Sequence, residues 1–374
     1  MRFCIITHAT HKEKNGNFFA YEPYVREMNL WLKYVGNVEI IAPKLESEPN
    51  AIEIEYQCNN IFYNKVSSIQ FTSLIYVLKS IFLLPSIFLK LFKACKRADH
   101  IHLRCPGNMG LLGCLVQIFF PNKKKTVKYA GNWDPESKQP LSYKFQRWIV
   151  SNTFLTKNCK VLVYGDWPNQ TKNIVPFFTA SYFKSEITEI IKKDFTSKIR
   201  LLFVGGLTEG KQPLLTVIAT HELIKKGYNV SLDLYGDGIK RNEILTYLRL
   251  YKLEKSIILH GNVSKEVVKK AFKEAHFLIF ISKSEGWPKV VAEAMFWSCL
   301  PISSNVSCIN YMLGNNKRGT VLNANVFKED IVIEIESYIK NKIIYKEKVL
   351  NAKRWSQNFT LDKFENEIKK IIDA

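Results

Sequence analysis

The chain has 374 residues, 47% of them hydrophobic, and carries 54 Lys and Arg against 34 Asp and Glu, for a net charge of +20. This length predicts two domains, and the basic excess runs through both halves, which excludes a simple basic tail. The eight cysteines show no C-x-x-C pair or metal-binding spacing, so they indicate reduced thiols in a cytosolic protein. The charge indicates an anionic partner, such as membrane lipid, a nucleotide-sugar, a phosphorylated acceptor or nucleic acid, unless it reflects only a lysine-rich proteome.

Strand patterns alternate with helical patterns along the first half of the chain. Met1 and Arg2 lead directly into an apolar run, so we expect no signal peptide. A helix is expected at 21–35, and buried strands are expected at 2–7, 38–42, 100–103, 126–129 and 161–164. Such alternation predicts a parallel, doubly wound α/β sheet, which binds ligands at the carboxyl edge of its strands.

The most apolar segment, 69–92, has the length of a membrane span. Gln70, Lys79, Lys90 and the central Pro85 argue against a span. Further basic residues follow at Lys93, Lys96 and Arg97. A helix with an apolar face and a basic end can lie on an anionic membrane surface, and the alternative is a core helix of the first domain. The charge of the whole chain favours the membrane surface slightly.

The charged stretch 184–198 is the best candidate for a linker, and the alternation resumes after it. Strands are expected at 199–204, 231–235, 257–260, 277–281 and 320–322. Helices are expected at 213–226, 265–275 and 289–299, from 328 onward, and within 343–372. The second half therefore predicts a second parallel α/β domain.

The stretch 282–301 carries two glutamates at a strand-to-helix junction. Glu285 lies in the loop and Glu293 lies one turn into the helix, near the positive end of its dipole, where a carboxylate is favoured. Gly286 allows close approach of the backbone, and the helix N-terminus offers N–H groups to hydroxyls or phosphate. Both glutamates can face one ligand, although either alone can also be a helix-capping charge.

The stretch 282–301 closely resembles the E-x7-E signature of the large retaining glycosyltransferase family of GT-B fold, known as family 4 or group 1. It matches at Ser282, Glu285, Gly286, Trp287, Pro288, Val290, Glu293, Ala294, Met295 and Pro301. It departs at Ser298 and Cys299, where the family often has Gly and a small residue. The resemblance implies two Rossmann-like doubly wound α/β domains facing a cleft. Residues 1–190 would bind the acceptor, 198–355 would bind the donor, and a C-terminal helix, 356–374, would cross back to the first domain.

The resemblance also implies roles at the donor site. Glu293 would hold the ribose hydroxyls, Glu285 would lie beside the transferred sugar, and Lys211 would offset charge on the leaving diphosphate. Lys211 matches the lysine of the family's G-R-L-x-x-x-K loop, but Gly206 stands where the arginine is expected. Backbone N–H groups of the loop, or Lys289, are alternatives for that missing cation. The remaining donor-binding candidates are Gly205, Gly236, Asp237, Gly238, His260, Gly261, Val263, Ser282, Gly286, Trp287, Pro288 and Val290.

The acceptor side departs most from the family. Relatives usually carry a glycine pair after the first strand, which this chain lacks, and Asn132 stands where many have histidine. The acceptor-side candidates are His8, His11, His102, Arg104, Asn132 and Asp134. The alternatives are a core histidine at 102 and a simple turn at 130–134.

The implied activity is retaining transfer of a hexose-type sugar from a nucleoside-diphosphate sugar, UDP- or GDP-linked. The acceptor would be a glycan or a polyprenyl-diphosphate-linked glycan in capsule, O-antigen or exopolysaccharide synthesis, at the inner face of the cytoplasmic membrane. No cofactor is expected, and without a D-x-D motif no metal is required. The alternative is a non-catalytic sugar-nucleotide or glycan-binding protein of the same fold. Retaining hydrolysis is disfavoured because both glutamates lie on one helical unit. Nucleic-acid binding is not expected, because no RNP or helix-turn-helix context is present.

Overall fold

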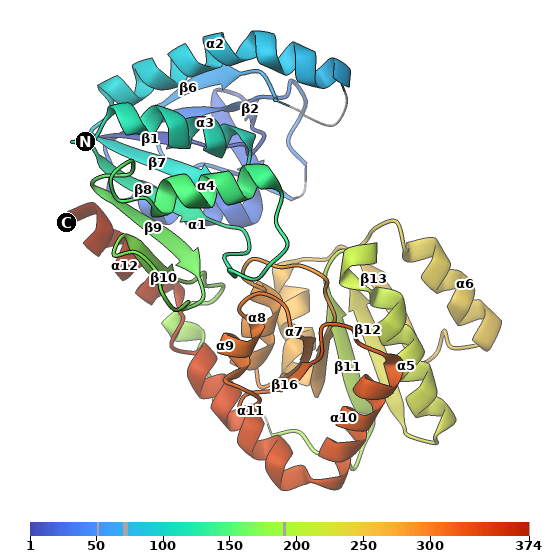
Figure 1. The fold of residues 1–374 in the computed structure, drawn as a ribbon. Helices are drawn as coiled ribbons and strands as arrows, with labels where there is room; N and C mark the ends of the chain where they lie inside the picture. The colour runs from blue at the N-terminus through green and yellow to red at the C-terminus, as the bar shows by residue number, and fades with distance from the viewer. Residues whose placement is uncertain (51, 70–73, 190–191, 374) are drawn as a thin grey trace. The chain divides into compact units, whose positions relative to one another are not determined.

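A computed structural model of the protein describes residues 1–50, 52–69, 74–189 and 192–373 (Figure 1). The chain divides into two compact units, one formed by Met1–Phe178 with Phe364–Ala374 and the other by Thr179–Lys363.

The first unit is built on a seven-stranded parallel sheet in the order β10-β9-β8-β7-β1-β4-β6. Its strands are β1 (Arg2–Ile6), β4 (Asn37–Pro43), β6 (Ile61–Val66), β7 (His100–Cys105), β8 (Lys124–Tyr129), β9 (Cys159–Tyr164) and β10 (Ile174–Phe177). The helices are α1 (Glu22–Leu32), α2 (Leu74–Arg97), α3 (Asn108–Val116) and α4 (Leu141–Ser151), with a 3-10 turn, η1 (Gln117–Phe119). Figure 1 shows α2, α3 and α4 over one face of this sheet.

Both faces of the inner strands of the first sheet are buried, as the apolar strand sequences predict. In β1, Phe3 packs on Trp31 of α1 with 6.0 Å between ring centroids, whereas Cys4 and Ile6 lie in the core beneath α2 and α3. The alternation follows from the two-residue repeat of a strand. A small antiparallel sheet of β2 (Lys12–Lys14), β3 (Asn17–Tyr21) and β5 (Glu53–Glu55) adds strands that the sequence patterns did not reveal.

Helix α2 is longer at its carboxyl end than the expected helix at 69–92. It runs through Pro85 to Arg97 because Ala94 and Cys95 are fully buried and continue its apolar face. Residues 70–73, where the expected helix begins, lie outside the described residues. Across the described ranges, we find no helix with both the length and the apolarity that a membrane crossing requires.

The second unit is built on a six-stranded parallel sheet in the order β13-β12-β11-β14-β15-β16. Its strands are β11 (Ile199–Val204), β12 (Val230–Tyr235), β13 (Ile257–Gly261), β14 (Phe277–Phe280), β15 (Leu300–Ser304) and β16 (Thr320–Leu322). Its helices are α5 (Pro213–Lys225), α6 (Arg241–Tyr251), α7 (Lys265–Glu274), α8 (Lys289–Phe296), α9 (Ile309–Leu313), α10 (Lys328–Lys340) and α11 (Lys342–Ser356), with 3-10 turns η2 (Lys184–Glu186) and η3 (Glu209–Lys211). The strand order reverses between β11 and β14, which is where open α/β sheets bind ligands.

The division between the units falls at 178, earlier than the expected linker, because the following residues pack into the second unit. Lys193 is half-buried there, and its ammonium donates to the carbonyls of Phe272 at 3.1 Å and Ser298 at 3.0 Å. The last helix, α12 (Leu361–Asp373), ends in the first unit, where Phe364 packs on Phe177 at 5.3 Å between ring centroids. The expected return of the chain end to the first domain is therefore confirmed.

Candidate active site

The candidate donor site lies at the carboxyl edge of the second sheet, at the reversal of strand order. The loop 205–211 follows β11, and the loop 281–288 follows β14, its neighbour in the sheet. The two loops are tied together, because the Lys283 N–H donates to the Gly210 carbonyl at 2.9 Å. The predicted strand–loop–helix of 277–299 is thus placed beside the predicted glycine loop.

Lys211 and Glu285 form an ion pair across these two loops. The same Glu285 oxygen accepts a hydrogen bond from the Ser282 hydroxyl at 2.6 Å. The Glu285 side chain is 12% exposed and that of Lys211 is 30% exposed, so solvent reaches the lysine more than the carboxylate. The Lys211 ammonium also lies 5.0 Å from the centroid of the Phe280 ring. The structure therefore joins the two residues predicted to be catalytic, although they are 74 positions apart.

The glycines of this edge allow two loops to pack backbone against backbone. A Cβ atom at Gly236 would lie 2.0 Å from the Gly205 carbonyl oxygen, and one at Gly238 would lie 2.6 Å from that of Leu207. The Gly205 N–H donates to the Tyr235 carbonyl at 2.9 Å, and the Leu207 N–H donates to the Asp237 carbonyl at 3.0 Å. Glycine is thus required at 236 and 238 for close packing.

Gly206, in contrast, is not required by packing. A Cβ atom there would meet its nearest neighbour, the Thr208 methyl carbon, at 3.5 Å, which is ordinary van der Waals contact. Its φ is also not among the positive values found at neighbouring glycines. The backbone therefore accepts a Cβ atom at this position, where the family resemblance leads us to expect an arginine.

Glu293 lies on α8 and accepts a hydrogen bond from the Ser181 hydroxyl. Lys265 of α7 holds the same segment, because its ammonium donates to the Ser181 carbonyl. Glu293 and Lys289 also line one small hollow with Ser181. The sequence patterns missed Ser181 because it lies in the segment between the units, outside any recognisable motif.

His260 and Tyr235 form a flat pair at the ends of β13 and β12. Their rings stack with 4.3 Å between centroids and an interplanar angle of 9°. The His260 Nε2 atom lies 2.7 Å from a carboxylate oxygen of Asp233, which fixes the orientation of the imidazole. Gly261 follows His260 with φ at +73°, and its carbonyl accepts from the Gly236 N–H at 2.8 Å. Val263, two residues further on, is 37% exposed.

The loop that carries Glu285 is fixed by contacts on both sides. The Gly286 carbonyl accepts from the Ser307 hydroxyl at 2.7 Å, and the buried Trp287 stacks near Trp355 with 6.4 Å between centroids. At its start, the Ser304 hydroxyl accepts from the Ser282 N–H at 2.9 Å. Pro288, Lys289 and Val290 then lead into α8. Ser304 and Ser307 were not predicted, because no sequence pattern reveals which later loop packs here.

Two acceptor-side candidates in the first unit, His8 and Arg104, lie at the carboxyl ends of β1 and β7. Burial and the nearby Arg104 charge lower the pKa of His8 from its ordinary value. The Arg104 guanidinium lies 4.6 Å from the centroid of the Tyr24 ring. Its Nη1 atom is buried and has no hydrogen-bond partner among the described residues. Arg104 is thus a cation without a paired carboxylate in that part of the chain.

The other two histidine candidates lie in the interior. The His11 Nδ1 atom lies 2.8 Å from the Ala9 carbonyl and Nε2 lies 2.8 Å from the Tyr56 hydroxyl, and burial lowers the pKa of His11 to about 4. His102 is 1% exposed, and its Nδ1 atom lies 2.8 Å from the Thr126 hydroxyl. Neither ring is exposed to an acceptor in this structure, because both are packed in the core. His102 therefore matches the core-histidine alternative.

Asn132 and Asp134 form a hydrogen-bonded turn. The Asn132 side-chain oxygen accepts from the Asp134 N–H at 2.9 Å, and an Asp134 carboxylate oxygen accepts from the Glu136 N–H at 2.9 Å. Such bonds are typical of turns built by Asn and Asp. The two side chains stabilise their own loop, as the simple-turn alternative predicts, and contact with an acceptor stays a prediction.

Comparisons with known proteins show what the chain is similar to. The family model described as "Glycosyl transferases group 1" matches residues 185–358. Protein CapJ of Staphylococcus aureus is 23% identical over 312 residues, which cover 78% of this chain and 76% of that protein. A second relative, from Campylobacter jejuni, is 24% identical over 205 residues, which cover 54% of this chain and 55% of that protein. It is named GalNAc-alpha-(1->4)-GalNAc-alpha-(1->3)-diNAcBac-PP-undecaprenol alpha-1,4-N-acetyl-D-galactosaminyltransferase.

Among solved structures, HepE of Anabaena in complex with UDP covers 100% of this chain and 99% of its own, with a TM-score of 0.68 and 11% identity. At that identity the likeness shows the fold alone. It confirms the predicted GT-B class with two Rossmann-like α/β units.

Proposed function

Because residues 185–358 match the model of the group 1 glycosyl transferases, we propose that the chain transfers a hexose-type sugar from a nucleoside-diphosphate sugar and retains the anomeric configuration. The observation that carries the proposal is the Lys211–Glu285 ion pair at the reversal of strand order in the second sheet. That edge is where a doubly wound sheet receives a nucleotide.

Lys211 and Glu285 have complementary roles in this reaction. When the bond between the anomeric carbon and the diphosphate oxygen breaks, the oxygen takes the electron pair, and the Lys211 ammonium stabilises its charge. Positive charge develops at the sugar carbon, which the Glu285 carboxylate favours. The acceptor hydroxyl attacks from the face that the diphosphate leaves. Its proton goes to the departing phosphate oxygen, which becomes basic as the bond breaks.

The Lys211–Glu285 ion pair is the arrangement of these side chains before the donor binds. Glu285 holds Lys211 in place through a short side-chain contact, while Ser282 holds Glu285. An incoming diphosphate competes for the ammonium and releases the carboxylate toward the sugar. Glu293 accepts a hydrogen bond from the Ser181 hydroxyl. When the donor binds, a ribose hydroxyl can take the place of that hydroxyl, because it also donates to the carboxylate.

The acceptor is proposed to bind the first unit near Arg104 and His8. The unpaired Arg104 guanidinium suits an acceptor with a phosphate or diphosphate. The name of the Campylobacter relative describes an undecaprenyl diphosphate-linked substrate, and the structure of HepE contains UDP. These support a UDP-sugar donor and a polyprenyl-diphosphate-linked glycan acceptor in surface polysaccharide synthesis. The net charge of +20 supports a place on the inner, anionic face of the cytoplasmic membrane.

The test is a screen of UDP- and GDP-sugars by thermal shift, followed by mass spectrometry of products with polyprenyl-diphosphate-linked acceptors. We expect one donor to raise the unfolding temperature and to yield a product one sugar heavier, and we expect NMR of the anomeric proton to show that the donor's configuration is retained. A donor that binds without transfer or hydrolysis, with every acceptor tried, would indicate the second candidate, a non-catalytic nucleotide-sugar-binding protein. The glycine at 206 favours that candidate, because it removes one cation from the diphosphate site.

A further inference from the structure

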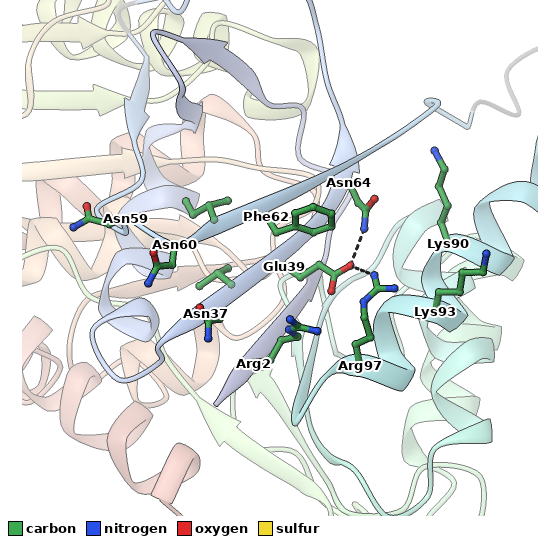
Figure 2. A pocket seen from close by; sticks show the side chains of 12 residues that line it. Arg2, Asn37, Glu39, Asn59, Asn60, Phe62, Asn64, Lys90, Lys93 and Arg97 are labelled. Carbon is green, nitrogen blue, oxygen red and sulfur yellow. Dashed lines mark hydrogen bonds and ion pairs between the residues drawn. The ribbon is translucent and has the colours of Figure 1, made fainter.

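A second concave site lies on the first unit, at the amino edge of its sheet. A groove of about 740 Å³ opens where β1, β4 and β6 begin, and it is bordered by the last turns of α2 (Figure 2). Arg2 and Asn37 are the first residues of β1 and β4. His8 and Arg104 belong to the opposite, carboxyl edge of this sheet, about 20 Å away over the length of a strand such as β4. The groove is thus separate from the candidate acceptor site.

The groove is rich in cations, and two of the four have no partner among the described residues. Arg2, Lys90, Lys93 and Arg97 line it, with Glu39 as its one lining carboxylate. Glu39 is 2% exposed and is already neutralised, because it pairs with Arg97 and accepts from the Asn64 amide at 2.7 Å. Across the described ranges, the Arg2 and Lys93 side chains have no ion-pair or hydrogen-bond partner. Their charges are available to an anionic ligand.

Amides and an aromatic ring line the rest of the groove. Figure 2 shows Asn37, Asn59 and Asn60 on the side opposite the α2 cations, with Phe62 between the two groups. Phe62 is 61% exposed, on the edge strand β6. Amide groups both donate and accept hydrogen bonds, which suits the vicinal hydroxyls of a sugar. An exposed ring suits the apolar C–H face of a pyranose.

The combination distinguishes among anionic ligands. A phosphate ion alone needs cations and N–H donors but no aromatic ring. A membrane surface is flat and needs a protruding face rather than a hollow lined by amides. The volume lies within the roughly 300–1,000 Å³ of small-ligand sites, which suits a short run of sugar units. Cations, amides and a ring together fit a saccharide with acidic substituents.

We propose that this groove is a second glycan-binding site, which holds an acidic saccharide carrying carboxylate or phosphate groups away from the site of sugar transfer. Arg2 and Lys93 pair with the acidic groups, the asparagines pair with hydroxyls, and Phe62 carries a sugar face. The inference goes beyond the proposed function, because binding here needs neither the donor nor Glu285.

The test measures binding of tetragalacturonate to the full chain by isothermal titration calorimetry, without any nucleotide-sugar. We expect tetragalacturonate to bind more tightly than the neutral maltotetraose, and its affinity to fall as salt is raised. The double variant R2Q/K93Q is expected to bind tetragalacturonate about tenfold more weakly. Phe62→Ala is expected to weaken both oligosaccharides. The matched control, K124Q/K172Q, removes two exposed lysines of the same unit outside the groove and is expected to leave both affinities unchanged.

Several outcomes would contradict the proposal that the groove binds an acidic saccharide. Equal tetragalacturonate affinities for the wild type and R2Q/K93Q, with unfolding temperatures also equal, would show that the acid binds elsewhere. Loss of binding to phosphatidylglycerol vesicles in R2Q/K93Q, with no tetragalacturonate binding by the wild type, would assign the groove to lipid headgroups instead. Titration of Glu285→Gln separates the two proposals, because an inactive variant that still binds tetragalacturonate supports the groove independently of sugar transfer.

Discussion

The two units of this protein treat charge differently at the carboxyl edges of their sheets. In the second unit each charged candidate already has a partner: Lys211 pairs with Glu285, and Glu293 accepts from Ser181. In the first unit Arg104 has no carboxylate partner among the described residues, and the histidines at 11 and 102 are buried and neutral. One edge is therefore pre-organised by its own residues, while the other leaves a cation for a ligand to neutralise. This difference supports the proposal that the second unit carries the reactive groups and that the first unit recognises the acceptor.

The largest expected effect comes from removing the Lys211–Glu285 ion pair at the carboxyl edge of the second sheet. Glu285→Gln keeps the size of the side chain but removes the charge that faces the developing positive carbon, so we expect transfer to fall about 100-fold in kcat. The matched control is Glu266→Gln, an exposed glutamate on α7 of the same unit, which should retain full activity. A kcat for Glu285→Gln within twofold of the wild type would remove Glu285 from the active site.

We expect acid to destabilise the first unit, because its buried histidines resist protonation in the folded state. Burial lowers the pKa of His11 to about 4, below the ordinary value of 6.5, so the unfolded chain takes up this proton first as pH falls. Stability is therefore full above pH 6.5 and is lost as pH falls from 6.5 to about 4, by about 3 kcal/mol for this one residue.

Urea unfolding between pH 4 and 7 measures this loss, followed by hydrogen exchange in β1 and β4 of the first unit. His11→Gln should flatten the pH dependence of the unfolding free energy, whatever it does to stability at pH 7. A variant that shows the same slope as the wild type would indicate that His11 is not the titrating group.

The variant Arg104→Gln tests whether the carboxyl edge of the first sheet recognises the acceptor. If Arg104 neutralises an anionic acceptor, we expect the acceptor KM to rise about tenfold while kcat and the donor KM change little. Arg26→Gln is the matched control, because it removes an exposed arginine of α1 that pairs with Glu22 on the surface. An unchanged acceptor KM in Arg104→Gln would move acceptor recognition away from this edge.

The two units also differ in how much of their candidate sites could be predicted from the sequence. In the second unit the positions of Glu285, Glu293 and Lys211 could be predicted, because they lie in local strand–loop–helix patterns whose geometry is set within a few residues. Their roles come from the family resemblance and stay predictions. The acceptor edge was less predictable, because burial decides its chemistry. His11 looks like a cleft residue in sequence, yet Tyr56, which is 45 positions away, occupies its Nε2 atom. The β2–β3–β5 sheet and Ser181 were missed for the same reason, since their roles come from long-range packing.

The departure at Ser298 from the family's glycine has a physical consequence. Ser298 adopts a φ of +63° just after α8, and its buried hydroxyl has no hydrogen-bond partner among the described residues. Ser298→Gly relieves the left-handed conformation and removes the unpaired hydroxyl, so we expect the free energy of unfolding to rise by about 1 kcal/mol. Ser307→Gly is an instructive comparison, because Ser307 also has a positive φ of +49° but donates to the Gly286 carbonyl. It should gain nothing, and equal gains in both variants would contradict the role of the hydroxyls.

The smallest expected effect concerns the missing cation of the donor edge. Gly206 has space for a side chain, and its conformation is not one that only glycine adopts, so Gly206→Arg should fold and place a guanidinium beside the glycine loop. We expect the donor KM to fall about threefold at low salt and the gain to vanish at high salt, as befits one partly exposed charge. Gly236→Arg is the contrasting variant, because its Cβ would lie 2.0 Å from the Gly205 carbonyl oxygen and should disrupt the loop. A donor KM that rises in Gly206→Arg would mean that the diphosphate does not lie at this loop. Lys289 would then be the candidate cation for the diphosphate.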